Sequence, residues 1–340
     1  MPDAPLSAVV RKPRAEATIA SLKAEGVYDA GRSVYACGEG SVAIPVTAPP
    51  EQTEIVEVIE GDAEPRLRTL ADHLRERGWS DDEVGRAPGS WAVLGSVILV
   101  DVGNVPAPAD LGEALLALHG QADTVLSRGG VAGPHREPDV EVIAGAGDTE
   151  TVHTEHGTTY AMNLGEVMFA PGNKAERARM GDAVGEDESV LDTFAGIGYF
   201  ALPMARAGAD VTAVERNPVA FEYLLENAVR NGVTDRLHAY RGDNREVVPQ
   251  LVAGGERFDR VVMGHYDAYE SLDAALEAIA PGGTLHLHEA TPEALVPERP
   301  VERLERAAAE ADRAVTVRDV REVKGYSEGV VHVVVDARIE

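Results

Sequence analysis

The sequence of 340 residues has little lysine, a single cysteine and no long hydrophobic run. Cys37 has no partner in the chain, which excludes an internal disulfide and a secreted framework built on disulfides. The longest apolar stretch, Trp91–Val100, is shorter than the ~20 residues that a helix needs to cross a bilayer. The first residues lack the charged start and apolar stretch of a signal peptide. These absences predict a soluble cytoplasmic protein with no membrane segment.

Charge is the most unusual feature of the composition. Asp and Glu number 58 against 31 Lys and Arg, a net charge of −27, and only 4 of the basic residues are Lys. Solubility alone does not require the loss of lysine, so we favour a cell interior at molar salt. Such acidity argues against a nucleic-acid partner, but at about 1 M salt the Debye length is only ~3 Å. Arginine keeps bidentate and stacking contacts there, so we expect arginines around any RNA-binding cleft.

Changes in composition divide the chain into three predicted segments. The first covers residues 1–60 and contains a helical pattern at Ala15–Glu25 before the Pro49-Pro50 break. The second covers residues 85–165 and opens with Trp91–Val100, which we interpret as a hairpin. Residues 64–77 read as a polar helical connection. The third segment, residues 166–340, carries the clearest pattern.

In the third segment, short β-branched runs alternate with helical patterns. The expected strands are Ser189–Ala195, Asp210–Glu215, Leu237–Asp243, Phe258–Gly264, Thr284–Ala290, Ala314–Val323 and Gly329–Ile339. Alternation of strand and helix predicts parallel pairing through right-handed crossovers. The last two runs are joined only by a short turn and should pair antiparallel. We therefore predict an α/β fold, a doubly wound seven-stranded sheet typical of class I methyltransferase-like domains, with smaller α+β domains before it.

Polar side chains and glycines follow the first three of these strands. Gly196 and Gly198 follow the first, where a tight turn lets a ligand approach the backbone. Glu215 ends the second, about 20 residues on, and can accept hydrogen bonds from both hydroxyls of a ribose. Asp243 and Asn244 follow the third and could hold the edge of an adenine. Since strand ends in such sheets meet at one edge, the three together predict a nucleoside site.

The identity of the nucleoside follows from the residues next to the glycines. A dinucleotide site would carry a third glycine where Phe200 stands, so Tyr199-Phe200 departs from that pattern. Asp192 is badly placed for a phosphate but suits a ligand with an ammonium or sulfonium group. S-adenosylmethionine therefore fits better than NAD.

Several motifs resemble the archaeal wyosine-pathway tRNA aminocarboxypropyltransferase family. They are Val167-Met-Phe-Ala-Pro-Gly-Asn-Lys-Ala-Glu-Arg-Ala-Arg-Met180, Asp192-Thr-Phe-Ala-Gly-Ile-Gly-Tyr-Phe200, Glu215-Arg-Asn-Pro218, Gly242-Asp-Asn-Arg245, Met263-Gly264 and Lys324-Gly-Tyr-Ser-Glu-Gly-Val-Val-His-Val-Val-Val-Asp336. The first segment more loosely resembles the N-terminal domain of the related tRNA guanine-37 N1-methyltransferases. The resemblance implies that this small domain binds tRNA and that residues 166–340 form the catalytic domain.

Two departures separate the chain from those methyltransferases. Where they carry Asn-Pro-Pro after the fourth strand, this chain has Met263-Gly264-His265, and where they carry an arginine after Phe-Ser-Pro, Gly172 follows Phe169-Ala-Pro. The sulfonium makes three carbons electrophilic, so orientation of the donor selects the product. We hypothesise that Gly264 gives the methionine arm room to present its γ carbon to the base instead of the methyl.

The resemblance implies transfer of the 3-amino-3-carboxypropyl group of S-adenosylmethionine to C7 of 4-demethylwyosine-37 in the anticodon loop of tRNA(Phe), with release of 5′-methylthioadenosine. Guanine-37 N1 methylation and non-catalytic tRNA binding are the alternatives. By the same resemblance, the cofactor-binding residues would be Ala170, Arg177, Asp192, Phe194, Gly196, Gly198, Glu215, Asp243, Asn244, Met263 and Gly264. Arg177, Asn173 and His265 would be the catalytic residues. We expect a monomer.

Some features have an equally plain structural explanation. Glu176-Arg-Ala-Arg179 could line the base pocket or be a solvated helix turn, and His135-Arg136 could touch RNA or be a surface turn. His286 and His288 project to the same face of a strand, but no other metal-ligand cluster accompanies them, so we predict no metal. Ala170 stands where a serine is usual in the family, which costs little if the contact is made by the backbone.

Overall fold

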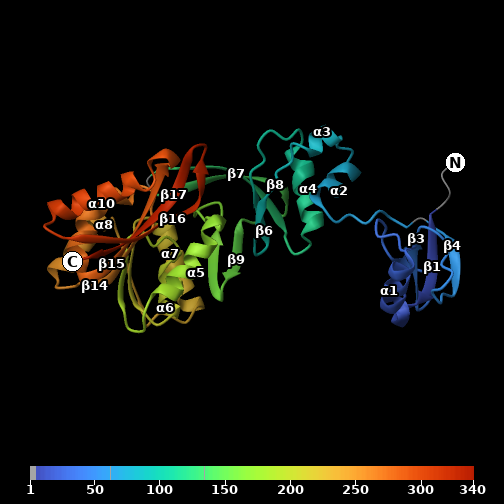
Figure 1. The fold of residues 1–340 in the computed structure, drawn as a ribbon, viewed down its shortest axis with the longest axis horizontal. Helices are drawn as coiled ribbons and strands as arrows, with labels where there is room; N and C mark the ends of the chain where they lie inside the picture. The colour runs from blue at the N-terminus through green and yellow to red at the C-terminus, as the bar shows by residue number, and fades with distance from the viewer. Residues whose placement is uncertain (1–4, 62, 134) are drawn as a thin grey trace. The chain divides into compact units, whose positions relative to one another are not determined.

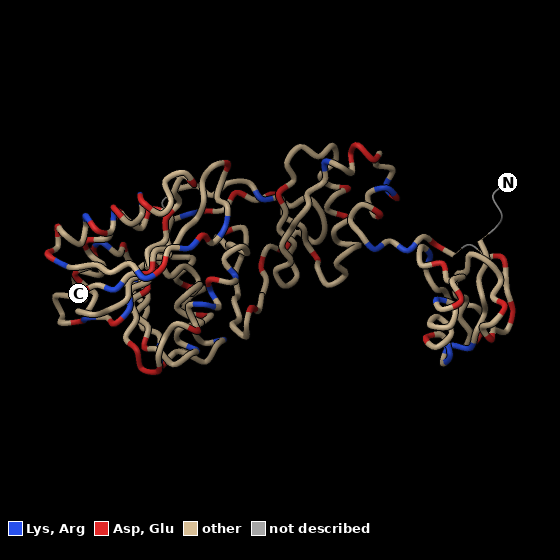
Figure 2. Tube along the Cα trace, viewed as in Figure 1, with Lys and Arg blue, Asp and Glu red and all other residues tan. Residues whose placement is uncertain are grey.

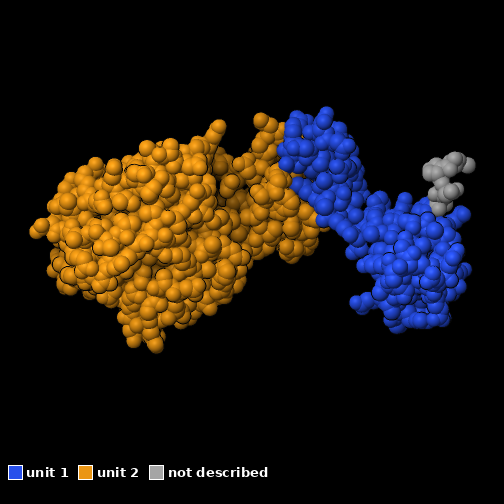
Figure 3. All heavy atoms as spheres, viewed as in Figure 1, with its two compact units in different colours: residues 1–87 blue, residues 88–340 orange. Residues whose placement is uncertain are grey.

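The computed structural model describes residues 5–61, 63–133 and 135–340. The chain divides into two compact units, residues 1–87 and 88–340 (Figure 3). Acidic residues are spread along the trace of both units (Figure 2). Within the described residues, no helix combines the length and apolarity required to span a membrane.

In its described residues, the first unit contains a four-stranded sheet of order β2-β3-β1-β4 and three α-helices (Figure 1). Its elements are β1 (Leu6–Arg11), η1 (Lys12–Arg14), α1 (Ala15–Glu25), β2 (Tyr35–Ala36), β3 (Ser41–Val46), β4 (Glu57–Glu60), α2 (Leu70–Glu76) and α3 (Asp81–Val84). Helix α1 has the predicted bounds and ends at Gly26, whose φ of 80° suits a residue without a side chain. Leu22 packs against Ile44 in the small core.

The second unit begins with a four-stranded sheet of order β5-β6-β7-β8. Its elements are β5 (Trp91–Leu94), β6 (Val97–Val100), α4 (Pro108–Leu118), β7 (Thr124–Ala132) and β8 (Glu137–Gly145), followed by the hairpin of β9 (Glu150–Glu155) and β10 (Thr158–Asn163). The predicted hairpin at Trp91–Val100 is confirmed. Strand β7 was missed from the sequence because Gly129 and Gly130 interrupt its hydrophobic pattern.

A seven-stranded sheet forms the rest of the second unit, with the order β13-β12-β11-β14-β15-β17-β16. Its strands are β11 (Ser189–Asp192), β12 (Asp210–Glu215), β13 (Leu237–Arg241), β14 (Phe258–Met263), β15 (Ile279–Pro292), β16 (Val315–Ser327) and β17 (Val330–Ile339). Strands β11 to β15 pair in parallel, and β17 pairs antiparallel with both neighbours. The predicted doubly wound sheet with a terminal hairpin is confirmed.

Helices cover both faces of this sheet (Figure 1). They are η2 (Pro171–Asn173), α5 (Lys174–Ala183), α6 (Ala201–Arg206), α7 (Pro218–Arg230), α8 (Asn244–Ala253), η3 (Ala268–Ser271), α9 (Leu272–Ala278), η4 (Glu293–Leu295) and α10 (Glu298–Glu310). Side chains of α5, α6 and α7 share one core with Leu94 and Leu126 of the preceding sheet. Side chains of α8, α9 and α10 form the core on the other face. The four-stranded and seven-stranded sheets of the second unit are therefore joined by a continuous core.

Candidate functional site

A cavity of about 370 Å³ lies at the carboxyl ends of β11, β12, β13 and β14. Parallel strands bring their ends to one edge of the sheet, which is where ligands bind in folds of this type. The lining includes four arginines and four acidic residues: Arg136, Arg177, Arg216, Arg245, Glu215, Asp243, Asp267 and Glu270. The cavity is thus lined by both signs of charge, despite the acidity of the whole chain.

Glu215 is held at the cavity wall by backbone amides. Its carboxylate accepts the N–H of Gly196 at 2.7 Å and the N–H of Asn217 at 2.7 Å. Burial raises the pKa of this carboxyl group. Because a carboxylate has about four acceptor positions, two backbone bonds leave capacity for ribose hydroxyls. Gly196 has a φ of 56°, and a Cβ there would lie 2.2 Å from the ring of Tyr199.

Asn244 and Asp243 line the cavity at the end of β13. The Asn244 side chain is buried and donates through Nδ2 to the Thr193 carbonyl at 3.2 Å, while its Oδ1 has no partner. An unpaired buried amide oxygen fits the amino group of an adenine. Asp243 caps α8 and pairs with Arg245 at 2.8 Å, and the hydrogen bond from Arg245 lowers the pKa of Asp243.

Three predicted cofactor-binding residues lie behind the cavity wall. Asp192 is fully buried, and its Oδ1 accepts the N–H of Phe194 at 3.2 Å, while Oδ2 has no partner. Burial, with a contribution from Glu215, raises the pKa of Asp192 to about 7. Gly198 packs against Leu202, and Met263 is fully buried. None of the three belongs to the cavity lining, so direct contact between them and a cofactor stays a prediction.

The segment before β11 brings Ala170, Asn173 and Arg177 to the cavity. Arg177 is buried, where its Nε donates to Glu155 at 2.7 Å and its Nη1 donates to the Ala170 carbonyl at 2.9 Å. Its guanidinium also lies 4.5 Å from the centre of the Phe169 ring. Arg177 therefore fixes the turn that presents Ala170, and Asn173 adds a buried Oδ1 without a partner.

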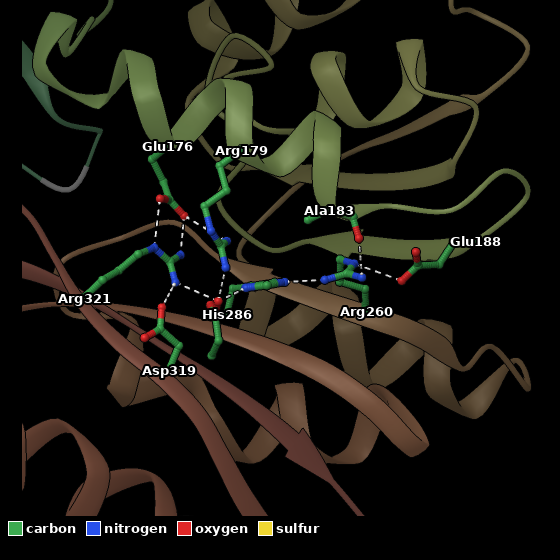
Figure 4. A network of polar contacts seen from close by, with 9 residues as sticks. Glu176, Arg179, Ala183, Glu188, Arg260, His286, Asp319 and Arg321 are labelled. Carbon is green, nitrogen blue, oxygen red and sulfur yellow. Dashed lines mark hydrogen bonds and ion pairs between the residues drawn. The ribbon is translucent and has the colours of Figure 1, made fainter.

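Arg179 lies in a separate network of charged residues instead of the predicted base pocket (Figure 4). It contacts Asp336, which also accepts from Arg321 at 2.6 Å. Arg321 pairs in turn with Glu176 of α5 at 2.5 Å. On its other side, Asp336 lies 2.6 Å from Nδ1 of His286, and Nε2 of that ring lies 2.6 Å from Arg260. Because Arg260 can only donate, His286 carries its proton on Nδ1.

His265 enters the cavity as a neutral ring. It stacks on Phe194 with ring centres 5.0 Å apart, and its Nδ1 accepts the N–H of Asp267 at 3.1 Å. Burial and the nearby Arg136 lower the pKa of His265 to about 4. Nε2 of the ring lies 3.5 Å from Nη1 of Arg136, a group that can only donate, so both ring nitrogens face hydrogen-bond donors of the protein. This geometry favours shaping of the pocket over uptake of a proton.

Gly264 lines the cavity next to His265. A Cβ at this position would lie 2.7 Å from the ring of Phe200. Contacts this short do not occur without displacement of the neighbour, so a side chain at residue 264 requires Phe200 to move. The space predicted from the sequence at Gly264 is therefore bounded by an aromatic ring.

Sequence reasoning missed several lining residues. Tyr199 packs over Gly196 and lines the cavity, and its position within the glycine motif was the available signal. Arg136 lies with its guanidinium 5.2 Å from the Tyr266 ring centre, in a left-handed conformation of φ 54°. The sequence offered His135-Arg136 as a possible RNA contact or a surface turn. Its ring partner Tyr266 is more than 100 residues away along the chain, so no local pattern places Arg136 at this cavity.

The histidines of β15 have partners within the fold. His288 lies with Nδ1 3.0 Å from Nε2 of His332, and burial lowers the pKa values of both rings. His286 belongs to the network around Asp336. Across the described ranges, no group of three or more His, Cys, Asp or Glu side chains is arranged to hold a metal ion.

The fold and this cavity define a class I methyltransferase-like protein with a nucleoside site formed by strand ends. Comparison with known proteins gives the family. Residues 151–317 match the TRM5/TYW2 methyltransferase domain, and residues 70–149 match the TYW2 N-terminal domain. The tRNA(Phe) (4-demethylwyosine(37)-C(7)) aminocarboxypropyltransferase of Pyrococcus horikoshii is 35% identical over 279 residues, 81% of this chain and 96% of the relative. This chain belongs to the TYW2 aminocarboxypropyltransferase family, which is related to Trm5.

Solved structures agree with this assignment. The structure of P. horikoshii TYW2 in complex with MeSAdo has a TM-score of 0.68 and 33% identity, and it covers 79% of this chain and 97% of that one. The structure of Trm5b from Pyrococcus abyssi has a TM-score of 0.72 and 27% identity, and it covers 98% of this chain and 99% of that one. The sequence resemblance to the aminocarboxypropyltransferases is thus confirmed.

Proposed function

We propose that this chain transfers the 3-amino-3-carboxypropyl group of S-adenosylmethionine to C7 of 4-demethylwyosine at position 37 of tRNA(Phe), with release of 5′-methylthioadenosine. The observation that carries the proposal is the match to the P. horikoshii aminocarboxypropyltransferase over 96% of that protein's length. The enzyme is then an S-adenosylmethionine-dependent transferase. The match to Trm5b supports the guanine-37 methyltransferase as the alternative to be excluded by experiment.

The cavity offers the groups that the donor requires. The donor supplies a sulfonium that makes its γ carbon electrophilic. Glu215 would accept from the ribose hydroxyls, and Asn244 Oδ1, which has no partner, would accept from the adenine amino group. The buried Oδ1 of Asn173 is a further acceptor at the same cavity. The acceptors of Glu215, Asn244 and Asn173 fit a nucleoside with an amino group and two hydroxyls.

Other residues of the chain would orient the reactants. Arg177 holds the turn at Ala170, and the ring of His265 is held by stacking on Phe194. The transfer forms a carbon–carbon bond at C7, breaks the bond between the γ carbon and sulfur, and releases the proton of C7. His265 is a poor acceptor for that proton at neutral pH because its pKa is lowered to about 4 by burial and Arg136. We propose that its part is to fix the base.

A labelling experiment tests the proposal. The protein is incubated with tRNA(Phe) that carries either guanosine-37 or 4-demethylwyosine-37, with donor labelled in the methyl or in the carboxyl carbon. Carboxyl label on the 4-demethylwyosine tRNA is the expected result. Methyl label on the guanosine tRNA would identify a methyltransferase instead, and binding without either label would identify a non-catalytic tRNA-binding protein.

Finer features of the assembly belong to the same proposal. We propose that the anticodon loop enters the cavity with the modified base unstacked, a route open to single-stranded RNA. Residues 1–60 would contribute tRNA binding, and the enzyme would act as a monomer in the cytoplasm of a halophilic archaeon. The halophilic part is supported by the lysine-poor composition with a net charge of −27. Activity that peaks at molar KCl is expected, and full activity at about 0.1 M KCl would contradict the halophilic part.

A further inference from the structure

Three basic side chains gather beside the cavity without an acidic partner. They are Arg128 of β7, Arg136 of the β7–β8 connection and Lys324 of β16. No ion pair among the described residues involves any of them, whereas the neighbouring Arg177 pairs with Glu155. The charged groups that act on Lys324 are Arg128, Arg177 and Arg136, and burial followed by these three cations lowers the pKa of Lys324 to about 8. The chain has a net charge of −27, yet in the part that the structure describes these three basic side chains have no acidic side chain paired with them.

Lys324 is placed by the turn that lines the cavity. An ideal Cβ on Gly172 would lie 2.9 Å from Cδ of Lys324 and 3.6 Å from its Nζ. The lysine stem therefore packs directly over the backbone of Gly172, in the turn between Ala170 and Asn173. A side chain at residue 172 would meet the far end of this flexible stem and would shift the ammonium group, so the glycine influences where that group lies.

Aromatic rings connect the same cations to the cavity. Lys324 pairs in the sheet with His332, whose ring lies 4.9 Å from Tyr266. Tyr266 lines the cavity and carries the Arg136 guanidinium at 5.2 Å. On the same ring, Tyr326 makes an edge contact at 4.7 Å while remaining 52% exposed. Arg136 and Lys324 thus stand at the rim of the cavity beside an exposed aromatic side chain, and Arg128 is close enough to act on Lys324.

We propose that Arg128, Arg136 and Lys324 bind a backbone phosphate of the RNA strand next to the target base, and that Gly172 sets the position of Lys324 in this phosphate site. The proposal rests on the proposed function, since it names how the same cavity holds its RNA. A phosphodiester fits because Lys and Arg are the usual phosphate partners. The exposed ring of Tyr326 offers a stacking face for an adjoining base.

The other anion available to the reaction is the carboxylate of the donor. Arg128 is exposed, and neither Arg128 nor Lys324 belongs to the lining of the nucleoside cavity. Arg136 alone borders both regions. A donor bound among Glu215, Asn244 and Asn173 has its acceptors inside the cavity, so the rim cluster is better placed for RNA.

Salt dependence of RNA binding tests the proposal. The dissociation constant of the full chain for unmodified tRNA(Phe) is measured over a series of KCl concentrations, and the constant for S-adenosylmethionine is measured by calorimetry. We expect Lys324→Met to weaken tRNA binding roughly tenfold and to reduce the slope of log Kd against log salt by about 1. Lys324→Arg should keep most of the slope. The matched control is Arg318→Met, which removes an exposed cation elsewhere on β16.

Gly172→Ala examines the geometric part of the proposal. Its methyl group must displace the Lys324 stem, so the variant should show part of the loss in slope seen for Lys324→Met. In the double variant Gly172→Ala/Lys324→Met, the second change should add nothing to the slope. If Gly172→Ala acted only on the structure of the turn, it would reduce the slope equally in the wild-type chain and in the Lys324→Met variant.

The remaining outcomes overturn the proposal. An unchanged slope with weaker donor binding assigns the cluster to the donor carboxylate, and an unchanged slope with unchanged donor binding reduces it to ordinary surface charge. The labelling experiment on the wild-type chain keeps the two proposals apart. If label is transferred but Lys324→Met leaves the slope of log Kd against log salt unchanged, only the phosphate site is rejected. If the slope depends on Lys324 but no label is transferred, only the proposed reaction is rejected.

Discussion

Two groups of buried polar residues lie within the second unit, and they differ in how their hydrogen bonds are used. In the network around Asp336, the carboxylate is contacted by Arg179, Arg321 and His286. At the cavity, Asn244 and Asn173 each keep a buried side-chain oxygen without a partner. Both groups are rich in buried polar side chains. In the first group, Nη1 of Arg179 has no hydrogen-bond partner but forms an ion pair with Glu176 at 3.6 Å, whereas the second group keeps unpaired acceptors at a cavity.

The difference shows which observation identifies a site. Both groups contain buried and charged side chains, so neither burial nor charge distinguishes a ligand-binding site from a structural network. Native proteins satisfy nearly all buried polar atoms, and an exception beside a cavity therefore indicates a ligand. The network around Asp336 instead fixes α5 to the sheet, since Glu176 of that helix pairs with Arg321 of β16.

The largest expected effect is a loss of stability when the network around Asp336 is broken. Asp336→Ala would leave Arg179, Arg321 and His286 without their shared carboxylate, and breaking a buried ion pair costs ~3–5 kcal/mol of stability. Denaturant unfolding measures this loss. If the variant is still folded at molar salt, donor affinity should remain close to that of the wild type. A stable variant that has lost donor binding would place Asp336 in the cavity chemistry.

The next effect concerns Asp192 and the pH dependence of stability. Because burial raises the pKa of Asp192 from its ordinary value to about 7, the folded state holds this proton more tightly than the unfolded chain does. The stabilisation is complete below about pH 4 and is lost as the pH rises through 7. The loss amounts to at most about 4 kcal/mol, at about 1.4 kcal/mol per pK unit.

Asp192→Asn should therefore remove this component of the pH dependence. The amide oxygen can still accept the N–H of Phe194, so the turn is preserved. Without donor, the variant should match the wild type at pH 4 and exceed its stability at pH 8. Parallel unfolding curves of the two proteins across this range would show that Asp192 does not titrate in the folded state.

A smaller effect is expected from removal of Glu215, the proposed ribose acceptor. Glu215→Ala leaves the amides of Gly196 and Asn217 unpaired as well, and each such loss costs about 1–3 kcal/mol. We expect donor affinity to fall roughly 100-fold in calorimetry, which is about 2.7 kcal/mol. Glu222→Ala, on the exposed side of α7, is the matched control. Equal affinities in the two variants would remove Glu215 from the site.

The smallest of these effects belongs to Gly264. A methyl group there would contact Phe200, so Gly264→Ala should shift the ring and narrow the space for the methionine arm. Carboxyl-label transfer should fall about tenfold in kcat/KM, equivalent to about 1.4 kcal/mol, with donor affinity changed less. An unaltered rate would show that the arm does not use the space at Gly264, and transfer of methyl label would show that this residue selects the reacting carbon.

The sequence predicted the part of the site that follows from topology. Glu215, Asp243 and Asn244 each end or follow a parallel strand, so the order of strands alone brings them to one edge. The polar network was not predictable, because Glu176 and Arg321 are 145 positions apart and neither belongs to a motif that names the other. Arg136 was considered as a possible RNA contact or a surface turn but not as part of this cavity, since its place there depends on the hairpin of β7 and β8.

The shared core of the second unit has a thermodynamic consequence. Leu126 of β7 packs in the same hydrophobic cluster as Val190 of β11 and Leu202 of α6. Residues 88–340 should therefore melt in a single calorimetric transition, although the sequence suggested two segments there. A destabilising substitution in β7 would then also destabilise the cavity. The connection between β7 and β8, which carries Arg136, cannot unfold without lowering the stability of the whole cooperative unit.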